Sequence, residues 1–290
     1  MDGVILPAES ARLPALSRAV LYGEGLFETL RTYGGRPFAW DRHLERLRGS
    51  AAELRIPLPP GLDGVQRAIP DLLRRNGLSD GVVRLTLLAG EGGGGFAGVA
   101  STSHLLLSVR EIPAALVEER RLGVQAVTKE VGSVPLAAHK STSYLRSVLA
   151  SRGSVGAVRE VLFLDDGARM LEGAASNVFV LAGGRLLTPP ADGRILPGVT
   201  RALVLDVARG TGLETRETAL GTGVVRDAEA LFLTSSVIEL LSVVALDGRV
   251  VGGGAPHVLV TELHRAYRDR VRRETGWSEE LTAQPGDQYT

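Results

Sequence analysis

The sequence contains no cysteine. A chain without thiols forms no disulfide, has no thiolate nucleophile and offers no cysteine ligand to a metal. Its five histidines show no spacing typical of a metal site, so we expect no bound metal. The formal net charge is zero, because 33 lysine and arginine residues balance 33 aspartate and glutamate residues. Bulk electrostatics therefore does not favour nucleic acid as a partner.

Long apolar runs are also missing. No uncharged apolar stretch is long enough to cross a bilayer, and no basic-then-apolar signal opens the sequence. We therefore expect a cytoplasmic protein with no membrane partner. The 290 residues are 44% hydrophobic and 23% charged, an ordinary globular composition whose length suggests two domains or one large one.

Strand and helix patterns are mixed along the chain, which predicts an α+β fold. Residues 26–33 alternate as a strand, Gly34-Gly35 follows as a turn, and 37–40 reads as the return strand of a hairpin. Asp41 is then placed to cap a helix. Pro70 predicts a break inside a second helix at about 65–75. Further strands are expected at 82–88, 105–109, 124–128, 161–164 and 230–233, and further helices at 202–209 and about 258–274.

The expected domain layout follows from these patterns. Residues 1–115 form a smaller N-terminal domain and 123–290 a larger C-terminal domain. Residues 116–122, which include the charged run at 118–121, are interpreted as a solvated linker between them.

The stretch from His139 to Phe179 carries the first candidate chemistry. Lys140 precedes a helix that Ser141, Thr142 or Ser143 could cap, and a helix N-terminus together with partial burial favours the neutral amine that Schiff-base chemistry needs. A hairpin turning at 165–167 would bring Glu172 back towards that lysine. Taken alone, Lys140 is better interpreted as a solvated surface lysine and Glu172 as a turn residue; the motifs later in the chain change that interpretation.

Two further stretches suit an anionic group such as a phosphate. Val199 and Thr200 lie where a helix begins, so their backbone N–H groups and the Thr200 hydroxyl could bind an anion. Residues 234–236 (Thr-Ser-Ser) supply hydroxyls on a turn after a strand. Arg46 could add a bidentate positive charge.

Two other features are interpreted as structural. The glycine run at 90–95 is followed neither by Gly-Lys-Ser/Thr nor by a helix, so it fits a flexible loop beside a pocket better than a phosphate loop or a dinucleotide site. His43 is interpreted as a packed helix residue.

Taken in order, the motifs resemble the class IV (fold type IV) pyridoxal-phosphate enzymes. This family includes branched-chain aminotransferases, D-amino-acid aminotransferases, (R)-amine transaminases and aminodeoxychorismate lyases. The resemblance runs from about Tyr22 to Asp247. The motifs that carry it are YGEGLFET at 22–29, HLERL at 43–47, KSTSY at 140–144, EGAASNVF at 172–179, LPGVTR at 196–201 and TSSVIE at 234–239.

The resemblance implies a two-domain fold of the D-amino-acid aminotransferase type and pyridoxal 5′-phosphate as cofactor. Lys140 resembles the lysine that holds the cofactor as a Schiff base and then moves a proton, and Glu172 resembles the partner of the ring nitrogen. Tyr144 resembles a tyrosine near the cofactor's phenolic oxygen, although its spacing from the lysine differs slightly. The remaining cofactor-binding positions implied are Arg46, Val199, Thr200, Ser235 and Ser236. The family's active site takes residues from a second subunit, so a homodimer is implied.

Substrate-binding positions follow from the same resemblance. They are Tyr22, Thr29, Arg84 and Val237. Thr29 resembles the threonine that the lyases favour where branched-chain aminotransferases carry glycine. Arg84 resembles an arginine that lines the substrate pocket of the branched-chain aminotransferases. The loop at 90–96 lacks the arginine or histidine that lyases and many D-amino-acid enzymes carry there, which leaves Arg84, or the turn at Ser236-Val237, to bind a substrate carboxylate.

The leading expectation is transamination between an amino acid (or amine) and a 2-oxo acid. One alternative is aminodeoxychorismate lyase, which forms 4-aminobenzoate and pyruvate; Thr29 favours the lyase and the glycine-only loop favours the transaminase. A second alternative is a non-catalytic phosphate-binding protein of the same fold. Lys140 and Glu172 argue against it, because simple phosphate binding needs neither.

Overall fold

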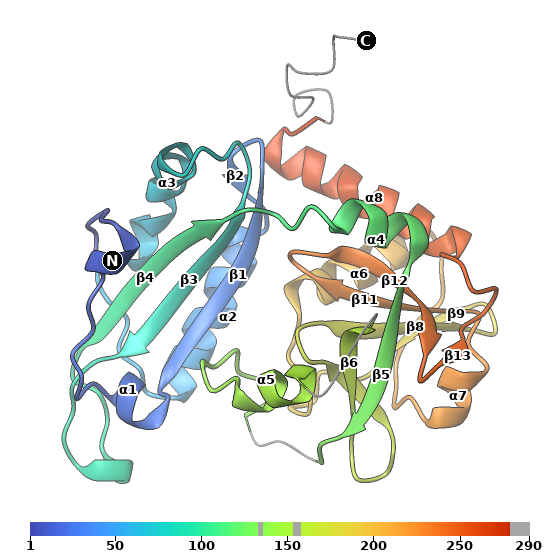
Figure 1. Ribbon diagram of the computed structural model, residues 1–290, viewed down its shortest axis with the longest axis horizontal. Coiled ribbons are helices and arrows are strands. Elements are labelled where there is room, and N and C mark those ends of the chain that lie inside the picture. The colour runs from blue at the N-terminus through green and yellow to red at the C-terminus, as the bar shows by residue number, and fades with distance from the viewer. Residues whose placement is uncertain (133–135, 153–157, 279–290) are drawn as a thin grey trace. The chain divides into compact units, whose positions relative to one another are not determined.

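The computed structural model describes residues 1–132, 136–152 and 158–278. They form two compact units (Figure 1). Unit 1 contains Met1–Ile112 and the described residues from Arg268 onward, and unit 2 contains Pro113–Tyr267. This division differs from the expected layout at both ends of unit 2, because the residues expected to be a linker lie inside it and the boundary near the C-terminus falls within a helix.

Unit 1 is an antiparallel sheet covered by helices. Its strand order is β2-β1-β3-β4, with β1 paired to β3 over seven residue pairs (Figure 1). Leucine and valine side chains of the sheet pack with α2 and α3 into one apolar core, including Leu30, Leu47 and Leu85. The elements are α1 (Arg18–Tyr22), β1 (Gly25–Tyr33), β2 (Arg36–Pro37), α2 (Trp40–Glu53), α3 (Ile69–Arg75), β3 (Val82–Ala89) and β4 (Ser103–Arg110), with 3-10 turns at Ala8–Ser10, Leu62–Ala68 and Gly95–Ala97.

The start of α2 differs from the expectation. The return strand β2 is only two residues long, and the helix begins at Trp40, which the sequence pattern placed in a strand. Ala39, not Asp41, occupies the cap position, with φ of 54° in the left-handed region. Its N–H donates to the Glu274 carboxylate at 2.7 Å, a partner 235 residues away that local pattern does not reveal. The break at Pro70 is confirmed, because a 3-10 turn ends there and α3 carries the proline in its first turn.

Unit 2 is built on a larger mixed sheet. Its nine strands follow the order β10-β9-β8-β11-β12-β5-β6-β7, with β13 paired to β12. The central strands are buried along almost their whole length, as in a sheet covered on both faces. The strands are β5 (Val124–Glu130), β6 (Val158–Leu164), β7 (Met170–Gly173), β8 (Asn177–Ala182), β9 (Arg185–Thr188), β10 (Thr215–Glu217), β11 (Ala230–Ser235), β12 (Glu239–Leu246) and β13 (Arg249–Val250).

Helices of unit 2 connect these strands. They are α4 (Leu116–Leu122), α5 (Leu145–Arg152), α6 (Val199–Gly210), α7 (Thr222–Arg226) and the first part of α8 (Val258–Thr275). Helix α4 replaces the expected linker at 116–122. Its charged run is not wholly solvated, since Arg120 is 17% exposed and pairs with the buried Glu239. An α+β architecture in two units is thus confirmed.

Within the described residues, no helix combines the length and the apolarity that crossing a membrane demands. In the same ranges, no group of three or more His, Asp or Glu side chains is gathered in a way that could hold a metal ion.

Candidate functional site

Lys140 lies in a run of tight turns that leads into α5. The N–H of Ser141 donates to the carbonyl of His139 at 2.9 Å, and that of Tyr144 to the carbonyl of Thr142 at 2.8 Å. Helix α5 begins at Leu145, and the N–H of Val148 in its first turn donates to the carbonyl of Tyr144, the residue just before the helix. Tyr144 therefore takes the cap position expected for a serine or threonine. The turns bring the Lys140 Nζ to 5.8 Å from the centre of the Tyr144 ring, so these two predicted residues lie together.

Glu172 is aimed by a bulge in the predicted hairpin. Leu162 pairs with Gly173 and Leu164 pairs with Met170, so Leu171 and Glu172 together oppose the single residue Phe163. An extra residue of this kind re-aims a side chain that strict alternation would send to the other face. Leu171 packs in one apolar cluster with Phe163, and Glu172 is close enough to act on the charge of a neighbouring arginine on α5.

That arginine is Arg146, which the sequence analysis missed. Its guanidinium lies over the Phe163 ring, 4.6 Å from the centroid. Burial lowers the pKa of Arg146, and the charge of Glu172 acts in the opposite direction. Arg146 thus places a positive charge close to Glu172, a role visible only once α5 is packed on β6.

The Glu172 carboxylate is tied to the turn that begins α6. Its Oε2 accepts the N–H of Leu196 at 3.0 Å, and Asn177 Nδ2 lies 3.4 Å from the same oxygen. Asn177 Nδ2 also donates to the Leu196 carbonyl at 3.0 Å. A Cβ atom on Gly198 would come within 1.9 Å of Asn177 Oδ1, so only glycine fits between Asn177 and the helix start. Asn177 is the second residue that the sequence analysis left without a role, although it lies within a quoted motif.

Helix α6 begins at the turn that holds Leu196. Its cap residue makes no side-chain hydrogen bond, and the first N–H groups of a helix have no acceptor within it. Val199 and Thr200 occupy these first positions as predicted, and both are buried. Arg201 follows them, buried, and donates through Nη2 to the Pro189 carbonyl and to Glu217, each at 2.7 Å. Arg201 therefore anchors the helix start.

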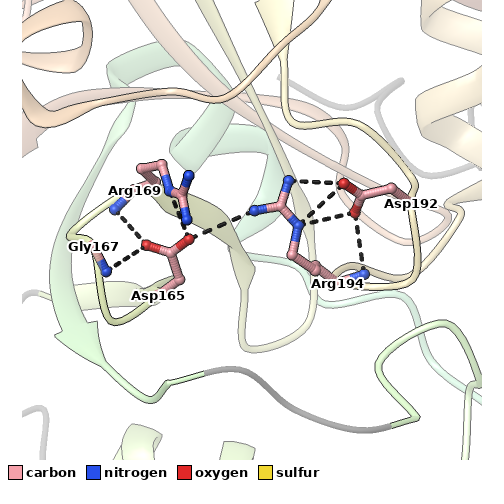
Figure 2. Close-up of polar contacts among 5 residues, drawn as sticks. All are labelled: Asp165, Gly167, Arg169, Asp192 and Arg194. Atoms are coloured by element: carbon pink, nitrogen blue, oxygen red, sulfur yellow. Dashed lines mark hydrogen bonds and ion pairs between the residues drawn. The ribbon is translucent and has the colours of Figure 1, made fainter.

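A second set of contacts joins the hairpin turn to the loop before α6 (Figure 2). Asp165 accepts the N–H groups of Gly167 and Arg169, each at 2.9 Å, and its other oxygen pairs with Arg169 Nε at 2.8 Å. Arg194, on the loop, reaches Asp165 at 3.6 Å and pairs with Asp192 at 2.7 Å. The hairpin that carries Glu172 and the loop that carries Leu196 are therefore held together by two contacts, Asp165 with Arg194 and Glu172 with Leu196.

The predicted hydroxyl turn lies between β11 and β12. Ser235 ends β11 and pairs with Glu239 across the hairpin, and Ser236 and Val237 form the turn. These three residues are all partly exposed. The hydroxyl of Thr234 is buried and has no hydrogen-bond partner among the described residues.

Arg46 is held by a buried carboxylate of unit 1. Alternation along β1 turns Glu28 towards α2, where Arg46 donates to its two oxygens at 2.9 and 2.6 Å. His43 Nδ1 lies 2.6 Å from Glu28 Oε2 and is buried, which confirms its interpretation as a packed helix residue. Burial alone would raise the pKa of Glu28, but the charge of Arg46 and hydrogen bonds from His43 and Arg46 outweigh it and lower the pKa to about 2.

Two of the predicted substrate residues, Thr29 on β1 and Arg84 on β3, lie on the sheet face opposite to Glu28. Thr29 is the register partner of Arg84, and the Arg84 guanidinium stacks 3.6 Å from the centre of the Phe27 ring. Tyr22 ends α1, and its ring lies 5.3 Å from that of Phe96 at the tip of the glycine loop. Thr29 and Arg84 are thus brought together, whereas Arg46 approaches β1 from the helix-covered face.

Comparisons with known proteins agree on one family. A sequence model described as amino-transferase class IV matches residues 25–246. A protein of Methanocaldococcus jannaschii, provisionally named a branched-chain-amino-acid aminotransferase, is 30% identical over 282 residues, 95% of this chain and 96% of the relative.

Solved structures give the same result. The branched-chain amino acid aminotransferase of Escherichia coli superposes with a TM-score of 0.83 at 27% identity, covering 97% of this chain and 96% of that one. A Legionella pneumophila protein, provisionally named a 4-amino-4-deoxychorismate lyase, gives 0.82 at 26% identity, covering 90% and 96%. The family model spans most of the chain, and the chain belongs to the class IV aminotransferase family.

Proposed function

We propose that the protein is a pyridoxal-phosphate-dependent enzyme that transfers an amino group between an amino acid and a 2-oxo acid. The observation that carries this proposal is that unit 2 holds the three kinds of group that the cofactor requires. An amine (Lys140) and a carboxylate fixed by a backbone amide (Glu172) accompany a helix start whose first N–H groups face no acceptor in the helix.

The donor set fits the cofactor group by group. Pyridoxal phosphate has an aldehyde, a basic ring nitrogen and a phosphate. Lys140 offers the amine for the aldehyde, and Glu172 offers a carboxylate for the protonated ring nitrogen. The N–H groups of Val199 and Thr200, with the Ser235 and Ser236 hydroxyls, offer donors for the phosphate. Arg46 offers a further cation, already oriented by Glu28.

The residues of the chain then have separable tasks. When bound, the cofactor supplies an electron sink for the pair left at the substrate α-carbon. Lys140 Nζ takes the proton from that carbon and delivers it again, acting as general base and acid. Glu172 holds a proton at the ring nitrogen. Arg84, exposed beside Thr29, offers a bidentate site for the substrate carboxylate, and Tyr22 and Val237 are further substrate-binding positions.

Two observations favour an amino acid with an aliphatic side chain. The apolar Phe27 ring lies under the Arg84 guanidinium, and the structural relatives include a branched-chain aminotransferase. The runner-up is aminodeoxychorismate lyase activity, which Thr29 and the likeness to the Legionella pneumophila protein support.

Borohydride trapping provides a sharp test, because the chain has only two lysines, Lys129 and Lys140. We expect a yellow protein with pyridoxal phosphate, and reduction followed by peptide mass spectrometry should place the cofactor on Lys140. Lys129→Ala, at an exposed position of β5, is the matched control and should retain the label. Lys140→Ala should abolish both label and turnover. Label on Lys129, or on neither lysine, would overturn the proposal.

A panel of L- and D-amino acids separates the two activities. Transamination predicts bleaching of the yellow band by at least one amino acid, with ping-pong kinetics when a 2-oxo acid is added. A yellow band that no amino acid bleaches, together with pyruvate release from aminodeoxychorismate, would establish the lyase.

We also propose that the enzyme is a homodimer. Helix α5, directly after Lys140, carries Leu145, Val148 and Leu149 at i, i+3 and i+4 with 66, 38 and 54% of their surface exposed. A second copy of the chain would bury this stripe. Light scattering should give twice the 30.7 kDa mass of one chain, and a monomeric mass at micromolar concentration would contradict the proposal.

A further inference from the structure

The turn that carries Ser235 and Ser236 ends at a residue in an unusual conformation. Glu239 has φ of 57°, in the left-handed region of backbone conformation that residues other than glycine and asparagine rarely adopt. A non-glycine residue persists there only when its surroundings hold it in place. The Glu239 side chain must therefore make contacts that glycine could not.

The Glu239 carboxylate is fully buried and contacted from two helices. Its Oε2 lies 2.6 Å from His264 Nε2 on α8 and 3.1 Å from Arg120 Nη2 on α4. A buried carboxylate requires such partners, because its desolvation is otherwise strongly unfavourable. Helices α4 and α8 thus hold Glu239, the first residue of β12, through contacts with its side chain.

The same arginine also holds the turn itself. Arg120 Nη2 donates to the carbonyl of Ile238 at 3.2 Å, next to Glu239. The N–H of Ile238 in turn donates to Ser235 Oγ at 3.4 Å. A hydroxyl that accepts a bond from the backbone keeps its own hydrogen for another acceptor. The contacts therefore run without interruption from Arg120 to a serine hydroxyl whose proton is left to point at a ligand.

We propose that Glu239, together with Arg120 and His264, is a positioning residue for phosphate binding: it holds the 235–238 turn so that the Ser235 hydroxyl donates to the cofactor phosphate. The inference rests on the proposed function, in which this turn binds the phosphate. None of the three residues touches the phosphate in this arrangement; they act through Ser235 and the turn backbone. Sequence motifs alone did not assign a role to Arg120 or His264.

The test compares pyridoxal phosphate with pyridoxal, which lacks the phosphate. Dissociation constants of both would be measured by absorbance titration of the cofactor-free full-length chain. For Glu239→Gln and His264→Ala we expect the affinity for pyridoxal phosphate to fall about tenfold, as for one lost charge-assisted contact, while the affinity for pyridoxal stays within about twofold of the parent protein. With saturating cofactor, kcat should change little.

Three further variants sharpen the comparison. Glu239→Gly removes the backbone strain at this position, because glycine adopts the left-handed conformation freely, but it also removes the carboxylate. We therefore expect this variant to lose the preference for pyridoxal phosphate over pyridoxal. His264→Gln keeps an N–H donor for Glu239, so its affinity for pyridoxal phosphate should be close to that of the parent protein. Glu214→Gln, which alters exposed ion pairs with Arg185 and Arg216 next to the edge strand β10, is the control and should match the parent protein.

The outcomes are distinct. Equal weakening of both ligands in the Glu239 and His264 variants would show a merely structural role and overturn the inference, as would unchanged affinity for pyridoxal phosphate. If the parent protein itself binds pyridoxal as tightly as pyridoxal phosphate, the proposed function fails first. Should Glu239→Gln not fold by circular dichroism, His264→Ala, at a position 21% exposed, decides the question alone.

Discussion

The backbone N–H of Leu196 donates to the Glu172 carboxylate at 3.0 Å, across 24 residues of sequence. This bond joins the strand that carries the acid to the turn that starts α6, and Asn177 reinforces it by bonding the Leu196 carbonyl. The acid proposed for the ring nitrogen and the helix start proposed for the phosphate are therefore set by one local network. A change at either end is expected to disturb both.

Gly198→Ala should disrupt this network. Its Cβ would lie 1.9 Å from Asn177 Oδ1, so Asn177 must move away from Glu172 and Leu196. We expect a loss of about 1–3 kcal/mol in the free energy of unfolding, typical of overpacking, and weaker cofactor binding. Gly210→Ala, at the last residue of the same helix with no atom within 4 Å of the new Cβ, is the matched control and should be neutral or slightly stabilising. Adding Asn177→Ala should recover stability but not cofactor affinity, and a purely additive double mutant would contradict the clash.

Glu28 should make stability depend on pH in acid. Its pKa is lowered in the folded chain from 4.5 to about 2, so its ionised form stabilises the fold above pH 4.5 and this contribution is lost as pH falls towards 2. The difference corresponds to roughly 3 kcal/mol at most. Denaturant unfolding should show Glu28→Gln less stable than the parent protein at pH 7, with the gap closing between pH 4.5 and 2. Glu45→Gln, exposed on the same helix, should show no such gap, and a pH-independent gap for Glu28→Gln would count against the ion pair as its cause.

Glu160 should behave in the opposite way. Burial raises the pKa of this carboxyl, and the hydrogen bonds from the Ser176 hydroxyl and the Val161 N–H only partly offset the effect. Because an acid with a raised folded pKa is destabilising wherever it must ionise, Glu160→Gln should be more stable than the parent protein at pH 8, with the advantage shrinking as pH falls towards 4. Thermal unfolding at the two pH values measures this. Glu160→Ala, which leaves the Ser176 hydroxyl without its acceptor, should be destabilised at both, and an unstable Glu160→Gln at pH 8 would show that the ionised form is needed.

Arg84 should determine how tightly the substrate carboxylate binds. Its guanidinium is stacked on Phe27 and exposed on the same face as Thr29. For Arg84→Gln we expect KM for the 2-oxo acid to rise about tenfold or more, the effect of one lost charge-assisted contact, with a smaller change in kcat. Arg84→Lys should recover only part of the affinity, because an ammonium neither stacks nor binds bidentately. Arg110→Gln, on β4 of the same sheet, is the control. A fall in kcat with KM unchanged would place Arg84 outside the carboxylate site.

The sequence by itself determined the elements whose cause is local. Alternation placed β1 and its hairpin, the Asp-Asp-Gly turn placed the β6–β7 hairpin, and Pro70 marked a break between two helical segments. Each follows from backbone preferences within a few residues. The motifs around Lys140, Glu172 and Val199 identified the family, because a family resemblance is carried by the order of such motifs along the chain.

Only the tertiary structure decided what holds those groups in place. Ala39 caps α2 in a left-handed conformation and donates its N–H to the distant Glu274. Glu172 is aimed by a bulge that strand alternation does not predict. Arg120 was expected to be a solvated charge, yet it pairs with a glutamate 119 positions further along the chain. Such long-range partners are selected by burial, which requires every charge in the interior to find its complement wherever the fold brings one.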